Sequence, residues 1–181
     1  MLKSVIRNQL RARMQRYDYD VSYMEHILDV SQPAFFKFAK LIELAQHRES
    51  APIDAYFAAK IAGARAEDCG PCTQLVVNMA LEAGMARDQI EAVLTRNFAA
   101  MSDDTALGLR FAEAIIHSAA NEDEVRDAVR AAWGEKGVVD LTFSLQVGRV
   151  FPMVKAGLGY AKECRRVNVG EKVVEVATLA A

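Results

Sequence analysis

The sequence predicts an all-α protein, a bundle of about seven or eight helices, folded as a single domain over residues 1–181. Three observations lead to this prediction. Apolar residues recur at helical spacing through most of the chain, and capping residues mark where helices begin and end. No series of alternating strands, long linker or repeat interrupts this pattern. Hydrophobic residues make up 52% of the chain, which suffices for one substantial core.

The first 32 residues are expected to form a helical extension. Leu2, Ile6, Leu10 and Met14 recur every four residues, as on one face of an amphipathic helix. The stretch is basic but lacks the continuous apolar core of a signal peptide. We expect this helix to pack against a partner surface. A transit peptide and a membrane-surface helix are the alternatives.

Two more helices are expected before residue 67. The first begins at Pro33, and its buried face consists of Phe35, Phe38, Ile42 and Ala45. The second is expected to be capped by Ser50 and to carry Pro52 in its first turn. Its apolar stripe is formed by Ile53, Phe57, Ile61 and Ala64.

The middle of the chain predicts three helices in succession. One runs from Pro71 to Gly84, which is placed to end it in a left-handed cap. A short helix follows over residues 86–97. A third begins after Ser102, with Asp103 and Asp104 in the first turn, where the helix dipole favours acids.

The C-terminal third carries two further predicted helices and a tail. Asn121 and Glu124 have the spacing of a capping box for a helix that stops at Gly134. The next helix is apolar on most sides, is expected to be buried, and should kink at Pro152. The tail, residues 165–181, alternates weakly; a strand pair and an irregular segment both fit it.

Composition excludes some classes of protein. The formal charge of −2 gives no general attraction to nucleic acid, which we do not expect as a partner. No uncharged apolar run reaches the roughly 18 residues that a membrane span needs, so no transmembrane span is expected, and we do not expect a membrane as a partner. Three cysteines, an odd number without a disulfide framework, fit a reducing compartment, and we expect a cytoplasmic protein.

The chemistry of the chain centres on "EDCGPC", in which Cys69 and Cys72 stand three residues apart. Residues at this spacing share a helix face, with Cβ atoms about 5–6 Å apart, and Gly70 and Pro71 allow the adjustment that a disulfide needs. Cys72 should lie in the first turn of a helix, capped by Asp68 or Gly70. There the dipole and unpaired N–H groups favour a thiolate and lower the thiol pKa.

Other interpretations of the pair stay open. A zinc site needs four ligands, and neither Cys164 nor the three histidines provide a second ligand pair at finger-like spacing. Two cysteines can also be small buried residues. Glu67 beside the pair is the candidate acid or base. Gln74 and Asn78 could donate hydrogen bonds to a thiolate, and any histidine (His26, His47 or His117) could fold back as a base.

The order of these segments resembles the AhpD-like, or carboxymuconolactone decarboxylase, family. The similarity runs from about Phe35 to Tyr160 and rests on "EDCGPC", "ALGLRFAEAI" and "WGEKGVVDLTFSLQVGRVFPMVKAGLGY". It implies a helical homo-oligomer that reduces alkyl hydroperoxides or disulfides and binds no cofactor. A lipoyl or thioredoxin-like protein dithiol would regenerate it. Cys72 would attack the peroxide and Cys69 would resolve; thioredoxin-like logic reverses these roles.

Two departures from the family pattern concern the proton relay. Val76 stands where redox members carry a histidine, and Phe57 where they carry a glutamate. We therefore expect a dithiol peroxidase or thiol:disulfide oxidoreductase with the site residues Cys72, Cys69 and Glu67. The alternatives are a non-redox decarboxylase-like enzyme, and a non-enzymatic homologue whose cysteine pair is structural or redox-sensing.

Overall fold

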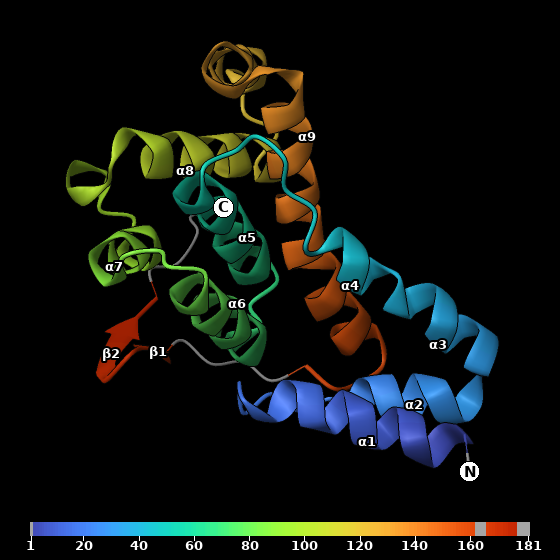
Figure 1. The fold of residues 1–181 in the computed structure, drawn as a ribbon. Coiled ribbons are helices and arrows are strands. Elements are labelled where there is room, and N and C mark those ends of the chain that lie inside the picture. The colour runs from blue at the N-terminus through green and yellow to red at the C-terminus, as the bar shows by residue number, and fades with distance from the viewer. Residues whose placement is uncertain (1, 162–165, 177–181) are drawn as a thin grey trace.

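A computed structural model describes residues 2–161 and 166–176, so Cys164 and residues 177–181 lie outside the described residues (Figure 1). The described chain is mostly helical, which confirms the prediction of a helical protein. It also contains one small two-stranded sheet. The first elements are α1 (Leu2–Gln15), α2 (Ser22–Val30), α3 (Gln32–Ala39), α4 (Leu41–Leu44), α5 (Ile53–Ala66) and α6 (Gly70–Glu82). There follow α7 (Arg87–Thr95), the 3-10 turn η1 (Phe98–Ala100), α8 (Asp103–Ile116), α9 (Glu122–Gly157), β1 (Arg166–Val169) and β2 (Lys172–Glu175).

Helix α5 is the central helix of the structure. It packs against α6, α8 and α9, and every residue from Ala55 to Arg65 is buried (Figure 1). The predicted single apolar stripe on this helix was too narrow, because Ala58, Ala59 and Ala62 let neighbouring helices approach from other sides as well. The last long helix was also expected to be buried. Helix α9 leaves Val139 and Met153 exposed, and α5 is the more completely buried of the two helices.

Small residues set the contact between α5 and α9. A Cβ atom added to Gly148 would lie 2.5 Å from the carbonyl oxygen of Lys60 and 3.2 Å from the Cα of Gly63. The backbones of the two helices can approach this closely only because neither glycine carries a side chain. This contact fixes the position of Lys60 on α5 relative to α9.

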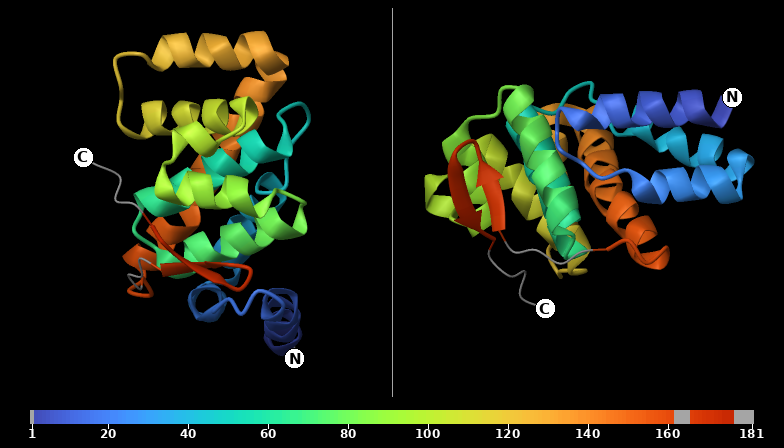
Figure 2. Two further views of the ribbon diagram at one scale, coloured as in Figure 1. Left: turned by 90° about the vertical axis from the view of Figure 1, so that its left-hand side faces the viewer. Right: turned by 90° about the horizontal axis from the view of Figure 1, so that it is seen from below.

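Helix α9 consists of two helical stretches that meet at Gly134. This residue has φ 70° and ψ −175°, outside the helical region, so the predicted stop at Gly134 is confirmed as a sharp bend. Gly134 is the only residue with non-helical dihedral angles within α9, which continues through Pro152 to Gly157. Figure 2 shows the stretch before the bend at the opposite end of the molecule from α1 and α2.

The N-terminal extension has a core of its own. Leu10, Met14, Tyr23, Leu28 and Phe35 are buried together, and Leu75 of α6 and Phe151 and Val154 of α9 pack against them. The predicted helix of residues 2–15 is confirmed. The face predicted from Phe35 to Ala45 is divided between α3 and α4, because the helix breaks at Lys40.

The described part of the C-terminal tail, residues 166–176, forms a β-hairpin, one of the two structures that its sequence allowed. Strands β1 and β2 are antiparallel, with Val167 opposite Val174, and a two-residue turn contains Gly170 at φ 63°. Val167, Val169 and Val174 are buried in the core formed around α5. The hairpin lies against α6 and α7 (Figure 2).

Local capping signals were right at some helix ends and wrong at others. Ser102 caps α8 by accepting a hydrogen bond from the Thr105 amide, and Gly84 ends α6 with φ 93°. Behind Gly84, the Met85 amide donates to the Ala80 carbonyl at 3.0 Å, which completes a Schellman motif. Asn121 precedes α9, but its side chain accepts no capping hydrogen bond.

Ser50 does not cap α5, contrary to the prediction. Pro52 occupies the N-cap position of the helix. The Ser50 amide instead donates to Asp140 of α9, and its hydroxyl donates to the carbonyl of Trp133 at 2.8 Å. These contacts with α9 hold Ser50 away from the first turn of α5.

Candidate redox site

The two cysteines lie at the beginning of α6 and form a disulfide bond. Their Cα atoms are 5.3 Å apart, and both residues are buried. Cys69 itself is the N-cap residue, with φ −96° and ψ 92°, so the predicted cap at Asp68 or Gly70 was one residue off on either side. Cys72 lies in the first turn, as predicted.

The backbone around the pair explains why the helix begins there. Asp68 adopts a left-handed conformation with φ 48°, and this reverses the chain after α5. Pro71 fits the first turn, where its missing N–H costs no hydrogen bond. The Cys69 carbonyl accepts the first helical hydrogen bonds, from the Thr73 amide at 2.9 Å and the Thr73 hydroxyl at 3.1 Å.

No side chain caps the N-terminus of α6, because a cysteine occupies the N-cap position. The amide groups of the first turn therefore have no competing carboxylate or hydroxyl from that residue. When the disulfide is reduced, a thiolate on either cysteine can take up this free hydrogen-bonding capacity, and the helix dipole stabilises it.

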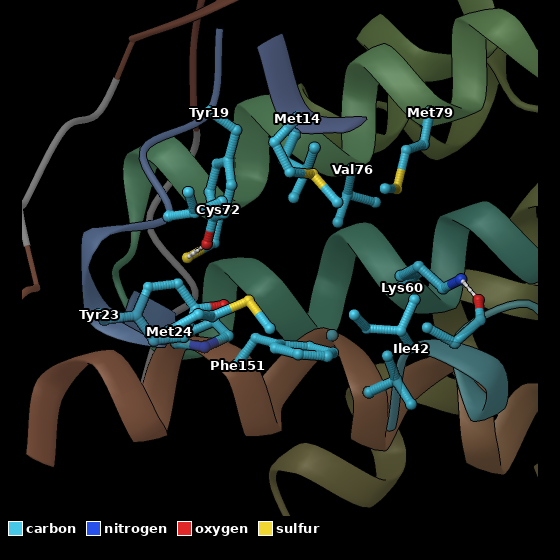
Figure 3. Close-up of a pocket in the computed structure, with 16 residues that line it drawn as sticks. Met14, Tyr19, Tyr23, Met24, Ile42, Lys60, Cys72, Val76, Met79 and Phe151 are labelled. Carbon is cyan, nitrogen blue, oxygen red and sulfur yellow. Dashed lines mark hydrogen bonds between the residues drawn. The ribbon is translucent and has the colours of Figure 1, made fainter. Parts of the chain in front are cut away.

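Tyr19 provides the polar contact of Cys72. Its hydroxyl lies 3.6 Å from the Cys72 sulfur, although the two residues are 53 positions apart in the sequence (Figure 3). Desolvation raises the pKa of Tyr19 to about 12, so the hydroxyl keeps its proton near neutral pH and acts as a donor. The ammonium group of Lys155 lies 4.7 Å from the centre of the Tyr19 ring.

An apolar pocket opens beside Cys72. It has a cavity volume of about 80 Å³ and lies between the N-terminal core and the core around α5. Residues of the extension and of α6 and α9 line it, among them Met14, Met24, Leu75, Met79, Val147 and Phe151 (Figure 3). Its apolar walls suit an apolar group of a small organic molecule.

Lys60 of α5 lies at the other end of this pocket from Cys72 (Figure 3). The side chain is only 4% exposed, and its ammonium group donates to the Ala45 carbonyl at 2.6 Å and to the Tyr56 hydroxyl at 2.8 Å. Burial lowers the pKa of Lys60 to about 7. Sequence patterns gave no indication of this residue, which appeared only as a polar position in an alanine-rich helix.

Glu67 lies next to the pair in sequence and is held by an ion pair. Its carboxylate accepts a hydrogen bond from Nε of Arg149 on α9 at 2.7 Å. The contact joins the segment before Cys69 to α9, and it engages the Glu67 carboxylate in an ion pair. Its predicted role as acid or base stays a prediction.

The polar residues of α6 contact the hairpin and the N-terminal extension. Gln74 donates to the Asn168 carbonyl at 2.9 Å and accepts from the Asn168 amide at 2.6 Å, which fixes β1 against α6. Asn78 accepts from Gln74 at 2.9 Å. These bonds account for both side chains without a contact to the cysteines.

None of the three histidines lines the apolar pocket. His26 lies beside Tyr160, with ring centres 5.8 Å apart, and His47 lies 3.6 Å from the Asp140 carboxylate. His117 is exposed at the end of α8. The idea that a histidine folds back onto the pair is therefore wrong, and the hydroxyl that does reach Cys72 belongs to Tyr19.

The two positions at which the sequence departs from the family pattern are apolar and largely buried. Val76 lines the apolar pocket one turn after Cys72. Phe57 packs its ring against Tyr56, with centres 5.3 Å apart, one turn before Lys60. Among the described residues that line this pocket, the titratable ones are two tyrosines, Lys60 and, once the disulfide is reduced, Cys72. No arginine or histidine is among them.

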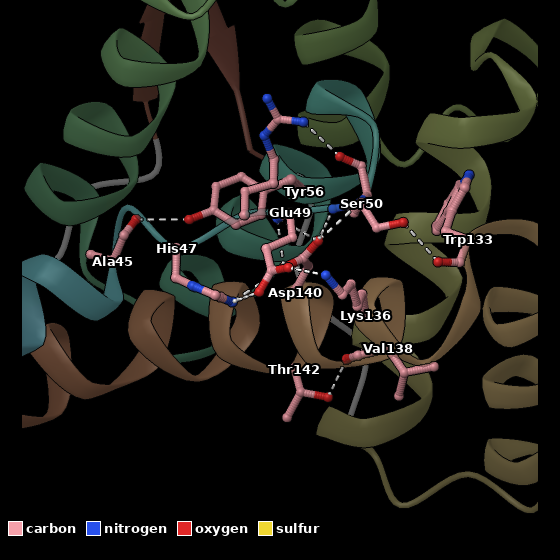
Figure 4. A network of polar contacts seen from close by, with 12 residues as sticks. Ala45, His47, Glu49, Ser50, Tyr56, Trp133, Lys136, Val138, Asp140 and Thr142 are labelled. Carbon is pink, nitrogen blue, oxygen red and sulfur yellow. Dashed lines mark hydrogen bonds and ion pairs between the residues drawn. The ribbon is translucent and has the colours of Figure 1, made fainter.

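A second polar cluster, which the sequence did not indicate, surrounds Asp140 of α9 (Figure 4). This fully buried carboxylate accepts hydrogen bonds from the amides of Glu49, Ser50 and Ala51 at 2.7–3.0 Å. It thereby fixes the loop between α4 and α5, which also carries Ala45. Because Ala45 accepts from both Lys60 and Tyr56, the cluster supports the polar end of the pocket.

The described residues provide no group of three or more histidine, cysteine or acidic side chains close enough to hold a metal ion. This finding does not test the expectation that the protein binds no cofactor, which stays a prediction. In the described part of the chain, no helix combines the length and the apolar character needed to cross a bilayer. Comparison of the chain with models of protein families, with curated proteins and with solved structures found no match.

Proposed function

We propose that the protein reduces organic hydroperoxides or disulfides through a dithiol–disulfide cycle of Cys69 and Cys72. The observation that carries the proposal is the environment of Cys72. Its sulfur is bonded to Cys69, lies 3.6 Å from the Tyr19 hydroxyl and contributes to the wall of an apolar pocket. A disulfide that only stabilised the fold would need neither the pocket nor the hydroxyl.

In the proposed reaction, the Cys72 thiolate attacks the terminal oxygen of a hydroperoxide. A sulfur–oxygen bond forms, the oxygen–oxygen bond breaks, and the alkoxide leaves as the alcohol after taking one proton. The Cys69 thiol then attacks the sulfenic acid, so the disulfide forms and water leaves. An external dithiol, lipoyl or thioredoxin-like, reduces the disulfide and is itself oxidised.

Tyr19 is the proposed source of the proton for the leaving alkoxide. Because the pKa of Tyr19 is about 12, its hydroxyl is too weak an acid to ionise at neutral pH but is a stronger acid than an alcohol. It can therefore donate to the alkoxide and regain a proton from water. The thiolate itself would be stabilised by the N-terminus of α6.

The assignment of roles rests on the pocket. Cys72 is among the described residues that line it, and Cys69 is not. The N-cap position of Cys69 would stabilise a thiolate there too, which is the basis of the reversed, thioredoxin-like assignment. Access to substrate therefore favours Cys72 as the attacking thiol and Cys69 as the resolving one.

Trapping the intermediate tests both the reaction and the roles. Reduced protein, carrying Cys164→Ser throughout so that only the pair contributes thiols, is mixed with one equivalent of cumene hydroperoxide and dimedone and analysed by mass spectrometry. We expect a rapid Cys69–Cys72 disulfide in the parent and a dimedone adduct on Cys72 in Cys69→Ser. An adduct on Cys69 in Cys72→Ser that forms faster than the adduct on Cys72 in Cys69→Ser would reverse the roles. Slow formation of every product would refute the redox function.

A further inference from the structure

The apolar pocket adjoins a second pocket of opposite character. Met14, Ile42, Ala45, Lys60 and Met79 line both, so Lys60 lies where the two pockets meet. Among the residues that the structure describes, four cationic side chains line the second pocket and no carboxylate does: Arg13, Arg16, Arg48 and Lys60. A ligand that extends from one pocket into the other would pass from apolar walls to a positively charged mouth.

The charges of the second pocket are only partly compensated. Arg16 forms an ion pair with Glu82 at 2.8 Å, and Arg48 donates to the Ala51 carbonyl at 2.8 Å. In the part of the chain that the structure describes, no carboxylate lies within ion-pair distance of Arg13, Arg48 or Lys60. A buried cation without an anionic partner is costly, and an anion supplied by a ligand removes that cost.

We propose that the substrate is a hydroperoxide of an aliphatic carboxylic acid, with its hydroperoxide group in the apolar pocket at Cys72 and its carboxylate at Lys60, Arg13 and Arg48. This inference rests on the proposed function and specifies its substrate. Lys60 donates two of its three N–H bonds within the protein, which leaves one for a carboxylate oxygen. Arg13 and Arg48 are exposed at the mouth and attract the anion from solution.

Two elements hold the recognising group in place. The Ala45 carbonyl accepts from Lys60 and from the Tyr56 hydroxyl, and Asp140 fixes the loop that carries Ala45. From the other side, Gly148 of α9 lets the backbone of Lys60 approach closely. The ammonium group is thus fixed at one end of the apolar pocket, with Cys72 at the other (Figure 3).

Binding of a non-reactive acid tests the inference apart from the redox chemistry. Isothermal titration of the disulfide form at pH 6.5 compares oleate with oleyl alcohol, both below their aggregation concentrations. We expect oleate to bind about 10- to 100-fold more tightly, as for one hydrogen-bonded ion pair, and Lys60→Met to abolish this preference. Arg13→Gln, at an exposed position, should reduce it even if Lys60→Met does not fold. Arg126→Gln on the distant part of α9 is the matched control and should retain it.

Turnover then links the site to the reaction. With dithiothreitol as reductant, kcat/KM is compared for a linoleic acid hydroperoxide and its methyl ester, and the acid should be preferred to the same degree as oleate. Equal turnover of acid and ester together with equal binding of oleate and oleyl alcohol would overturn the inference while the proposed function stands. Preferential oleate binding without any peroxide reduction would overturn the proposed function and leave the anion site.

Discussion

Tyr19 is the residue on which the proposed proton transfer depends. Tyr19→Phe removes the hydroxyl 3.6 Å from the Cys72 sulfur and keeps the ring that Lys155 contacts. General acids contribute about 100-fold or more to such steps, so we expect the rate of peroxide reduction to fall by about 100-fold. Stopped-flow measurement of disulfide formation would determine it. Tyr160→Phe, at a tyrosine that contacts His26, should leave the rate unchanged; a Tyr19→Phe rate equal to that of the parent would remove Tyr19 from the mechanism.

Lys60 should make stability depend on pH. Its pKa is lowered from 10.5 to about 7 by burial, so between these values the unfolded chain binds the extra proton. Stability therefore rises with pH through this window, and the cost of burying the charge is greatest below pH 7. Between pH 6 and pH 9, the free energy of unfolding of the parent should increase by about 2 kcal/mol relative to Lys60→Met.

Urea denaturation at the two pH values measures that difference, with Lys37→Met, at an exposed lysine of α3, as the control. The comparison cancels the other groups around Lys60, which are Tyr56 on α5, Arg13 on α1, Arg16 just after α1, and Arg48, and also Asp140 on α9, which acts on Tyr56. A difference that is the same at both pH values would show that Lys60 titrates like an exposed lysine.

Among the elements, the loop between α4 and α5 depends on a single carboxylate. Asp140→Ala leaves the amides of Glu49, Ser50 and Ala51 without their acceptor in a partly buried environment. We expect a loss of about 3 kcal/mol in the free energy of unfolding, measured by urea denaturation, and a smaller loss for Asp140→Asn. Asp127→Ala, at an exposed position on the same helix, should change stability by less than about 0.5 kcal/mol. Similar values for the two alanine variants would contradict this role.

The limits of sequence-based prediction are visible in the same elements. Ser102 and Gly84 act through bonds to residues within one turn, so local patterns predicted them correctly. Ser50 has the same local signal, yet it contacts Trp133 and Asp140, which are 83 and 90 residues away, and no local pattern can indicate that. The central position of α5 was likewise not predicted, because the predicted stripe covered one face of the helix and left out the alanines on its other faces, which allow close helix packing.

For the whole molecule, the cysteine pair was found from its spacing and its Gly-Pro interior, but its surroundings were not. Tyr19 reaches Cys72 across 53 residues, and Lys60 gains its environment from a loop, from α1 and from α9. These contacts exist only because the N-terminal extension packs against the helices around α5 and closes a pocket between two cores. The homo-oligomer implied by the family resemblance stays a prediction.

The central claim is that the pair reacts with peroxides faster than ordinary thiols do. The most direct test is the second-order rate constant for reduced protein carrying Cys164→Ser with cumene hydroperoxide, followed by stopped flow beside free cysteine at the same pH. The pocket, the N-terminus of α6 and Tyr19 together predict a rate constant at least about 100-fold above that of free cysteine, lost in Cys72→Ser. A rate constant equal to that of free cysteine would contradict the redox function.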